Sequence, residues 1–225
     1  MKIDKDAAPF TALTAVPALA AWLAGKRRLA LGLGALSAAV TAFFRDPDRF
    51  PDEVRDIDPD LVLAPADGKV MHAGPAQRDV SPDGDWQQVS IFLSLLDVHI
   101  NRAPYGGTIT KLTYTSGKYL AAFSDHSATD NERTEITVTR DVDGERRTVI
   151  FRQIVGLLAR RVVTRVELGE QITTGQRIGL MKFGSRMDVF IPPGVPLLVS
   201  KGDRVIAGES TLARWPVVTD GDRLS

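Results

Sequence analysis

The chain contains no cysteine and only three histidines, His72, His99 and His126, among its 225 residues. Without cysteine it can form neither disulfide bonds nor thiolate metal sites, and it has no cysteine nucleophile. Three histidines at scattered positions are too few to suggest a dedicated zinc site. We therefore expect no metal centre.

The sequence also lacks an excess of charge of either sign. Lysine plus arginine and aspartate plus glutamate both number 28, so no global basic field attracts nucleic acid, and we expect no nucleic-acid partner. The glycine-rich phosphate loops G-x-G-x-x-G and G-x-x-x-x-G-K-[ST] do not occur, so no external nucleotide cofactor is indicated. The length suits one globular domain with one appended segment.

Long uncharged runs are confined to the amino end, at residues 7–25 and 29–44, on either side of the basic residues 26–28. A membrane span needs roughly 20 apolar residues, and these runs are near or below that length. We predict that residues 1–45 form a helical hairpin that associates with the cell membrane, peripherally or by shallow insertion, at the cytoplasmic face. A secretory signal peptide and an ordinary buried hairpin are the alternatives.

From Arg45 the composition changes to a connector rich in proline and aspartate, in which each proline disfavours helix at the residue before it. Short strand patterns follow at residues 61–64, 69–73, 88–95 and 108–115. Residues 135–140 and 148–153 then alternate apolar and polar side chains around Asp143-Gly144, a dipeptide favoured in hairpin turns. We predict a mainly β domain over residues 46–225.

An internal repeat lies in the last third of the chain. Residues 166–175 and 199–208 share the pattern V-x-x-G-[DE]-x-[IV]-x-x-G. Glycines at fixed offsets suit tight turns between short strands. The repeat therefore predicts two similar β-hairpin units folded over one another, as in the barrel-sandwich hybrids of biotinyl and lipoyl carriers.

Between the two repeats, residues 181–192 (MKFGSRMDVFIP) form an apolar strand pattern that Gly184-Ser185 interrupts. Glycine is costly inside a strand. On the dipeptide alone, a β-bulge or a close backbone approach is the simpler interpretation.

The surrounding sequence changes that interpretation, because this segment resembles the processing segment of the short form of phosphatidylserine decarboxylase. Four further segments resemble the same family in the same order, and the resemblance covers nearly the whole chain from Phe43 to the carboxyl end. They are residues 43–49 (FFRDPDR), 65–68 (PADG), 95–104 (LLDVHINRAP), and 131–133 (NER) with the later 153–161 (QIVGLLARR).

The resemblance implies that the chain cuts itself between Gly184 and Ser185 into a β chain, residues 1–184, and an α chain, residues 185–225, which remain together as a heterodimer. A deprotonated serine hydroxyl attacks the preceding carbonyl. Elimination and hydrolysis then release ammonia and leave a pyruvoyl group on residue 185. This implied cofactor forms a Schiff base with phosphatidylserine and accepts the electrons released with carbon dioxide, which yields phosphatidylethanolamine.

Self-cleavage needs a base, and His99 is the main candidate, because the Asp97 carboxylate is placed to orient its imidazole. A structural histidine is the alternative. By resemblance to the long form of the family, Asp67 belongs to an Asp-His-Ser relay, with a simple Asp-Gly turn as its alternative. The chain departs from the long form at Arg102, which stands where that form has a second histidine.

Because of this departure, His99 is expected to serve cleavage, substrate protonation or both. His126 lies in the polar stretch 124–131 and is a second candidate for the base. His72 lies in an apolar strand pattern and is expected to be structural.

The phospholipid headgroup carries phosphate and carboxylate, so arginines are expected to position it. Arg102 and Arg186 are the first candidates because of the segments in which they lie, and Arg133 is the third. A solvated salt bridge is the alternative for each of them.

Two other functions compete with this one. The first is a membrane-tethered carrier, because Met181-Lys182 is faintly similar to a modified-lysine turn, although a carrier explains neither His99 nor Ser185. The second is a pyruvoyl-dependent decarboxylase for a soluble amino acid, against which the apolar amino end argues. The sequence does not fix the number of copies, and a homo-oligomer stays open.

Overall fold

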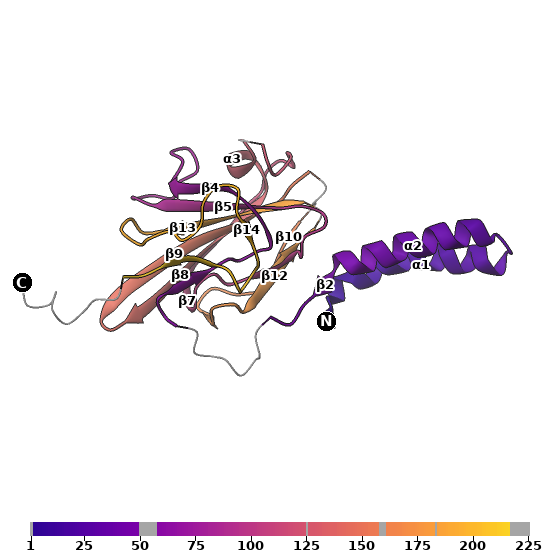
Figure 1. Ribbon diagram of the computed structural model, residues 1–225, viewed down its shortest axis with the longest axis horizontal. Coiled ribbons are helices and arrows are strands. Elements are labelled where there is room, and N and C mark those ends of the chain that lie inside the picture. The colour runs from indigo at the N-terminus through magenta and orange to yellow at the C-terminus, as the bar shows by residue number, and fades with distance from the viewer. Residues whose placement is uncertain (1, 50–57, 125, 158–160, 183, 217–225) are drawn as a thin grey trace, which may run out of the picture.

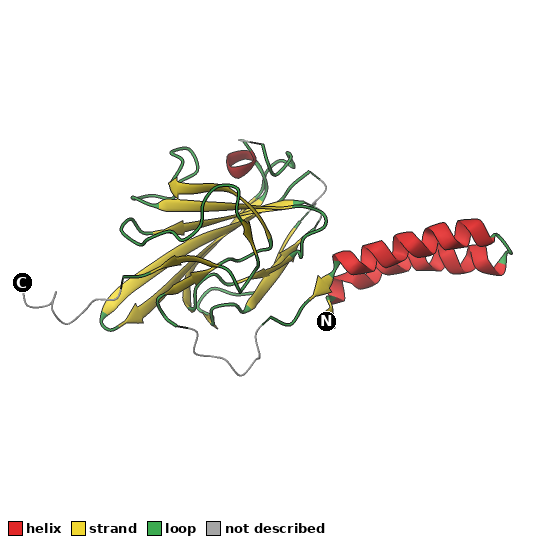
Figure 2. Cartoon of the chain, in the orientation of Figure 1, coloured by secondary structure: helices red, strands yellow, loops and turns green. Residues whose placement is uncertain are grey.

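The computed structural model describes residues 2–49, 58–124, 126–157, 161–182 and 184–216, and consists of a helical hairpin that projects from a β-rich body (Figure 1). The hairpin pairs α1 (Ala8–Leu23) with α2 (Arg27–Phe43) after a short 3-10 turn at Lys5–Ala7. Gly25 ends α1 with a left-handed φ of 72°, which lets the chain reverse. Figure 2 shows that α3 (Ser127–Asp130) is the other α-helix among the described residues. The predicted helix pair is confirmed.

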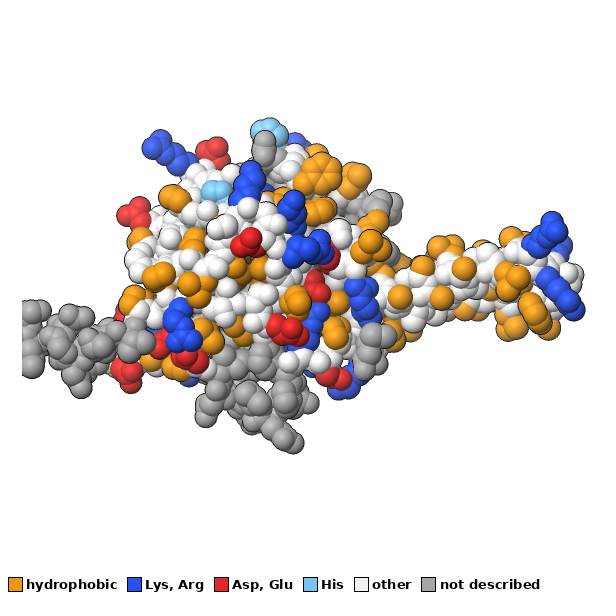
Figure 3. All heavy atoms as spheres, viewed as in Figure 1, with side chains coloured by type: hydrophobic (Ala, Val, Ile, Leu, Met, Phe, Trp, Pro, Cys, Tyr) orange, Lys and Arg blue, Asp and Glu red, His pale blue; other side chains and the backbone are white. Residues whose placement is uncertain are grey.

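Most apolar side chains of the hairpin face away from the protein. Leu13, Leu23 and Leu31 are 74%, 78% and 67% exposed, and hydrophobic atoms cover much of the visible hairpin surface (Figure 3). An ordinary buried hairpin would place these side chains in a protein core, so that alternative is wrong. By length and composition, one helix, at Lys5–Leu23, is apolar enough to cross a membrane.

Three sets of contacts fix the base of the hairpin to the body. Strand β1 (Lys2–Ile3) pairs with β2 (Arg45–Asp46), and Arg165 binds the carboxylates of Asp4 at 2.6 Å and Asp6 at 2.9 Å. Phe43 and Phe44 pack in an apolar cluster with Val98, Ile100 and Leu180 of the body. The hairpin therefore ends on the segment that contains His99.

The body is built around a curled, antiparallel sheet of eight strands in the order β11-β7-β8-β9-β13-β5-β4-β14. These strands are β4 (Gly68–Pro75), β5 (Gln87–Leu93), β7 (Gly107–Thr115), β8 (Arg133–Val142), β9 (Glu145–Ile154), β11 (Gln171–Ile172), β13 (Ser185–Ile191) and β14 (Arg204–Val205). The mainly β class is confirmed.

Two smaller sheets complete the body. One has the order β10-β12-β6, formed by Val162–Thr164, Arg177–Met181 and Ile100–Arg102. The other pairs β15 (Thr211–Arg214) with β3 (Leu61–Leu63). The three-stranded sheet matters for the site, because β6 continues from His99 and β12 leads toward Gly184.

The predicted hairpin around Asp143-Gly144 is confirmed as β8 and β9. Asp143 and Gly144 have φ angles of 51° and 83°. Positive φ at both central residues defines the turn whose twist matches that of the flanking strands.

The two copies of the sequence repeat make equivalent backbone contacts at opposite edges of the large sheet. In the first copy, the Gly169 N–H donates to the Ile109 carbonyl at 2.8 Å, and in the second the Gly202 N–H donates to the Val70 carbonyl at 2.8 Å. The first copy contributes edge strand β11 and the second contributes β14. The repeat thus marks the same local structure used twice.

Strand β13 lies in the interior of the large sheet, between β9 and β5. Its odd-numbered residues Met187, Val189 and Ile191 enter the main core, whereas Phe190 packs in a separate cluster beneath α3. This alternation follows the period of two along a strand. Ser185, at its first position, pairs with Leu93 of β5, whereas the pairing with β9 begins one residue later at Arg186.

A substitution at Gly179 tests how closely β12 packs against the neighbouring strand β10. Its φ is 153°, and a methyl group there would overlap the carbonyl oxygen of Val163 on β10. We expect Gly179→Ala to lower the free energy of unfolding by about 3 kcal/mol or more, because backbone must shift within a sheet.

Gly194→Ala is the control, because Gly194 has a φ of 89° and no atom within 4 Å of its missing methyl. Only left-handed strain of about 1–2 kcal/mol is expected there. Urea unfolding in detergent, followed by circular dichroism, measures both variants. Equal losses would contradict the close packing of β12 against β10.

Candidate active site

The Gly184–Ser185 bond lies where the turn after β12 enters β13. Ser185 pairs with Leu93 of β5 and is fully buried. Its Oγ has no hydrogen-bond partner in the described structure, an unusual state for a buried hydroxyl. Gly184 has a left-handed φ of 73°. Phe183, which belongs to the predicted processing segment, lies outside the described residues.

His99 lies directly before β6 and contacts Gly184 on the amino side of this bond. The Gly184 N–H donates to His99 Nε2 at 3.2 Å, and His99 Nδ1 lies 3.0 Å from the Asp97 carbonyl oxygen. A backbone N–H can only donate and a carbonyl can only accept. The ring therefore carries its proton on Nδ1, and Nε2 presents a lone pair to the cleavage segment.

Burial keeps this imidazole neutral. His99 is 1% exposed, and desolvation lowers its pKa from 6.5 to about 4, against the opposing effects of the Asp97 carbonyl and the carboxylates of Asp97 and Asp67. The ring of Phe43, at the end of α2, lies 4.3 Å from the imidazole between ring centroids. The sequence analysis did not identify Phe43 as part of the site, although it begins the FFRDPDR segment.

The Asp97 carboxylate does not orient the ring, contrary to the expectation from sequence. It accepts hydrogen bonds from the backbone N–H and Oγ of Ser94, at 2.8 and 2.6 Å, and pairs with Arg204 at 2.6 Å. The backbone carbonyl of Asp97 holds Nδ1 instead. The Asp97 carboxylate thus stabilises the turn before His99 and forms an ion pair with Arg204.

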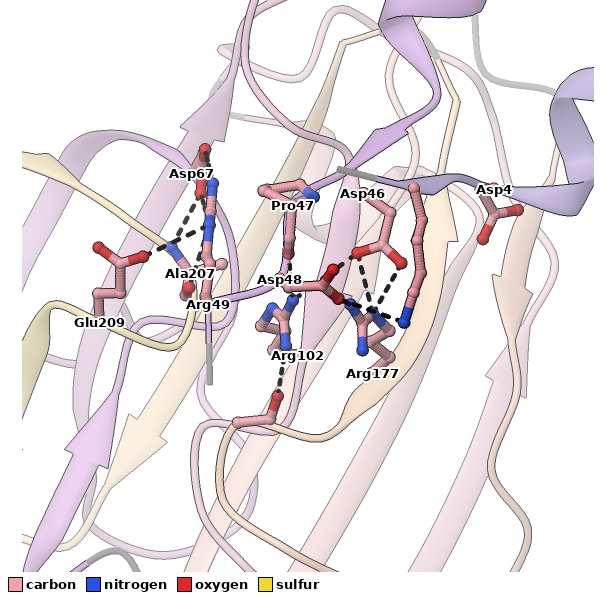
Figure 4. Close-up of polar contacts among 12 residues, drawn as sticks. Asp4, Asp46, Pro47, Asp48, Arg49, Asp67, Arg102, Arg177, Ala207 and Glu209 are labelled. Atoms are coloured by element: carbon pink, nitrogen blue, oxygen red, sulfur yellow. Dashed lines mark hydrogen bonds and ion pairs between the residues drawn. The ribbon is translucent and has the colours of Figure 1, made fainter. Parts of the chain in front are cut away.

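Asp67 is also engaged away from the histidine (Figure 4). Both of its oxygens pair with the Arg49 guanidinium, at 2.7 Å for Oδ2 to Nη2, and Oδ1 accepts the Ala207 N–H at 2.9 Å. In the uncut chain, these contacts hold the connector to the body. No hydrogen bond joins Asp67 to any of the three histidines in the described structure.

Arg102 does not line an open site. It is buried and donates to the carbonyls of Gly175 and Pro47, each at 3.0 Å, with Asp46 at 3.7 Å (Figure 4). Burial lowers the pKa of its guanidinium. In this position Arg102 fixes the connector, and its substrate-binding role stays a prediction.

The other two candidate arginines differ from each other. Arg133 donates to the carbonyls of Thr129 at 2.7 Å and Asn131 at 3.2 Å, which secures the end of α3. Arg186 directly follows Ser185 on the outer face of the sheet and lines a surface hollow. Of the predicted arginines, Arg186 is the one beside the cleavage bond.

The remaining histidines do not reach this bond. The Nε2 of His72 lies 2.9 Å from the carbonyl of Pro75 near the end of β4, which agrees with the expected structural role. His126 is exposed at the start of α3. Among the described residues, His99 is the histidine whose ring bonds to Gly184.

Gly156 makes room for the carbonyl that cleavage would attack. A methyl group on Gly156 would overlap the Gly184 carbonyl oxygen. The φ of Gly156 lies outside the left-handed region, so its backbone conformation does not require glycine. The requirement is steric, and the only signal in the sequence was its place in the QIVGLLARR segment, of which residues 158–160 lie outside the described structure.

An apolar hollow of about 410 Å³ opens beside Gly184. Leu96 and Phe123 on its rim are 84% and 69% exposed, and several large apolar side chains exposed together are more informative than a single one. A patch of this kind suits an apolar ligand or a lipid surface. Its main lining side chains are Phe92, Leu95, Leu96, Phe123 and Leu157.

The residues at this bond fit a pyruvoyl group formed in place. A buried serine hydroxyl without a partner, a neutral imidazole and a glycine carbonyl that packs against Gly156 are the groups that an acyl shift can use here. Among the described residues, no cluster of His, Asp and Glu side chains suitable for a metal ion is present.

Comparison with known proteins agrees with this geometry. Residues 36–213 match the family model described as phosphatidylserine decarboxylase. Two relatives bear the name phosphatidylserine decarboxylase proenzyme: one from Solibacter usitatus, 45% identical over 90% of this chain and 91% of the relative, and one from Paramagnetospirillum magneticum, 44% identical over 94% and 86%. A third, from Neorickettsia sennetsu, is 46% identical over 82% and 80%. The chain therefore belongs to the phosphatidylserine decarboxylase family.

Proposed function

We propose that the chain cuts itself between Gly184 and Ser185, and that the pyruvoyl group made from Ser185 is the cofactor with which it decarboxylates phosphatidylserine to phosphatidylethanolamine. The contact between His99 Nε2 and the Gly184 N–H, next to the unpartnered Ser185 hydroxyl, is the observation that carries this proposal. Membership of a family whose relatives are named proenzymes supports it.

Cleavage starts when Ser185 Oγ gives its proton to His99 and attacks the Gly184 carbonyl carbon. The C–N bond between the two residues breaks as the new ester bond forms, and the nitrogen takes up a proton. Loss of the Ser185 Cα proton then breaks the Cβ–Oγ bond, which frees the Gly184 carboxylate. Water hydrolyses the remaining dehydroalanine, and ammonia leaves.

His99 suits the base in this reaction because its unprotonated Nε2 lies at Gly184, the residue that carries the attacked carbonyl. Burial holds the pKa of His99 near 4, so the imidazole is neutral and able to accept a proton throughout the physiological pH range. We propose that the same nitrogen faces residue 185 after cleavage. We propose that it then returns a proton to the substrate carbon that has lost carbon dioxide.

A pyruvoyl group supplies a ketone that condenses with a primary amine and draws in the electron pair released by decarboxylation. The chain fixes residue 185 for this role, because β13 is hydrogen-bonded to β5 on one side and β9 on the other. The same pairing is expected to keep chains 1–184 and 185–225 together after cleavage. The apolar hollow beside Gly184 places hydrocarbon side chains next to the reacting end.

We further propose that residues 1–45 anchor the chain at the cytoplasmic face of the cell membrane and that residues 46–225 form the catalytic domain. Exposed leucines along α1 and α2 and on the rim of the apolar hollow support this arrangement. The equivalent contacts of the two repeats support a domain of the barrel-sandwich-hybrid kind.

The carrier alternative is weaker than the decarboxylase. A carrier lysine must stand free at an exposed turn to be modified, whereas Lys182 Nζ lies 5.1 Å above the ring of Phe10 at the base of the hairpin.

The choice of base is tested with His99→Ala and His126→Ala. We expect His99→Ala to slow self-cleavage by roughly 100-fold or more, the usual contribution of a positioned general base, whereas His126→Ala cleaves at the normal rate. Ser185→Ala should stay uncut and release no carbon dioxide. Gel analysis of the processed fraction over time measures cleavage, and labelled phosphatidylserine measures decarboxylation. Normal cleavage by His99→Ala would exclude it as the base.

Phe43→Ala tests whether the hairpin sets the protonation of His99. Water admitted beside the ring raises the pKa of His99 from about 4 toward 6.5. Because His99 must be neutral to act, we expect the acid limb of the cleavage rate to move to higher pH. The variant is then much slower than the parent at pH 5.5 and closer to it at pH 8.

Phe10→Ala is the matched control, because Phe10 stacks on Phe44 in the same apolar cluster. It should leave the position of the acid limb unchanged. The same shift in both variants would indicate general loosening of the cluster, and no shift in Phe43→Ala would contradict the role of its ring.

Gly156→Ala tests the position of the carbonyl that Ser185 attacks. We expect at least a 100-fold slower cleavage, because a displacement of about 1 Å at a reacting atom costs this much. Gly117→Ala is the control, because a methyl there would overlap the Asp130 carbonyl without touching the cleavage bond. Similar cleavage rates for the two variants would contradict the role of Gly156.

A further inference from the structure

Three side chains form a row across the outer face of the large sheet beside the cleavage bond. Phe92 of β5 pairs with Lys69 of β4 on one side and with Arg186 of β13 on the other. Residues directly opposite one another on antiparallel strands lie on the same face, about 5 Å apart. Arg186 follows residue 185 directly, so the row begins one residue from the reacting end.

The row borders a second hollow, of about 660 Å³, whose lining is polar and basic. Lys69, Lys201 and Arg186 contribute the charge, and His72 and Ser90 contribute further polar atoms. Figure 3 shows Lys and Arg side chains beside hydrophobic ones on the face over β4, β5 and β14.

Arg186 is held rigidly in this hollow. Its side chain is 6% exposed, Nε donates to Asp188 at 2.7 Å and one Nη nitrogen donates to Ser90 Oγ at 3.1 Å. The other Nη nitrogen has no hydrogen-bond partner among the described residues. A guanidinium that is fixed on one side and free on the other is suited to bind an oxyanion.

The charge in the hollow is not balanced by the protein. Asp188 offsets Arg186, but neither Lys69 nor Lys201 has an ion-pair partner within the described ranges. Two lysines and a partly free guanidinium around one hollow therefore favour an anionic ligand.

The basic hollow adjoins the apolar hollow described above. Phe123 lines both, and its ring stands edge-on to that of Phe92, with centroids 5.9 Å apart. Gly184 lines the apolar side and Arg186 the basic side. The cleavage bond thus lies between a basic surface that can bind anions and an apolar surface that can contact hydrocarbon chains.

We propose that Lys69, Lys201 and Arg186 bind the phosphodiester of phosphatidylserine while its acyl chains lie over the apolar hollow, an inference that rests on the proposed function. In this lipid the phosphate is separated from the serine Cα only by a methylene and an ester oxygen. We propose that phosphate bound beside Arg186 places the amino group within reach of the chain end at residue 185, which directly precedes Arg186 in β13. Free serine has no such anchor.

Kinetics of the processed enzyme test this site. Lys69→Gln/Lys201→Gln is compared with the parent on phosphatidylserine in neutral detergent micelles, with Lys111→Gln/Arg140→Gln on β7 and β8 as the charge-matched control. We expect KM to rise at least roughly tenfold, the loss for one charged hydrogen bond, with kcat and the processed fraction unchanged. An unchanged KM, or an equal rise in the control, would overturn the proposal.

Calorimetry on the uncut Ser185→Ala chain tests the hollow without decarboxylation, so failure of the proposed function is distinguished from failure of this site. Glycerophosphoserine should bind, and the added Lys69→Gln/Lys201→Gln pair should weaken binding at least roughly tenfold. Inorganic phosphate binding as tightly as glycerophosphoserine would indicate a free-phosphate site instead. Lysine variants that lose only binding to phosphatidylglycerol vesicles would indicate membrane docking. Either result overturns the proposal.

Discussion

The chemistry proposed at the Gly184–Ser185 bond depends on how one imidazole is buried. His99 is held by a carbonyl on Nδ1 and by the Gly184 N–H on Nε2, under the ring of Phe43. Backbone groups on both sides determine which nitrogen carries the proton, and burial keeps the other unprotonated. A water-exposed histidine at the same distance from Gly184 would have a pKa near its usual value of about 6.5. A fraction of the molecules would then carry a protonated imidazole, whose Nε2 has no lone pair to accept a proton. The helical hairpin supplies part of this burial, so the proposed membrane segment and the proposed base are physically linked.

Strand β13 serves cleavage and substrate binding at once. Its first residue is the serine of the proposed cut, its inward residues fill the core, and its outward Arg186 lines the basic hollow. Because β5 and β9 hold it along both edges, a break at its amino end leaves the rest of the sheet paired. Because this chain end is already ordered, it loses little further conformational entropy when the substrate binds.

The structural features that depend on local sequence pattern were predicted correctly. The two apolar runs became α1 and α2, the Asp143-Gly144 turn joined β8 to β9, and the repeat marked both edges of the large sheet. The sequence did not predict the contacts between side chains that are distant along the chain. Asp97 pairs with Arg204, 107 positions away, and Arg102 binds the connector. The partner of a buried charged side chain depends on which residues the fold brings beside it. The roles suggested for Phe43 and Gly156 depend on contacts across the fold, which a single sequence does not display.

Intact-mass spectrometry of the purified protein under denaturing conditions tests whether the chain cuts itself at Ser185. We expect two fragments, one ending at Gly184 and one beginning at residue 185. The second should be lighter than a serine-started peptide by the difference between serine and a pyruvoyl group. A single chain of full mass in a preparation that decarboxylates phosphatidylserine would contradict it.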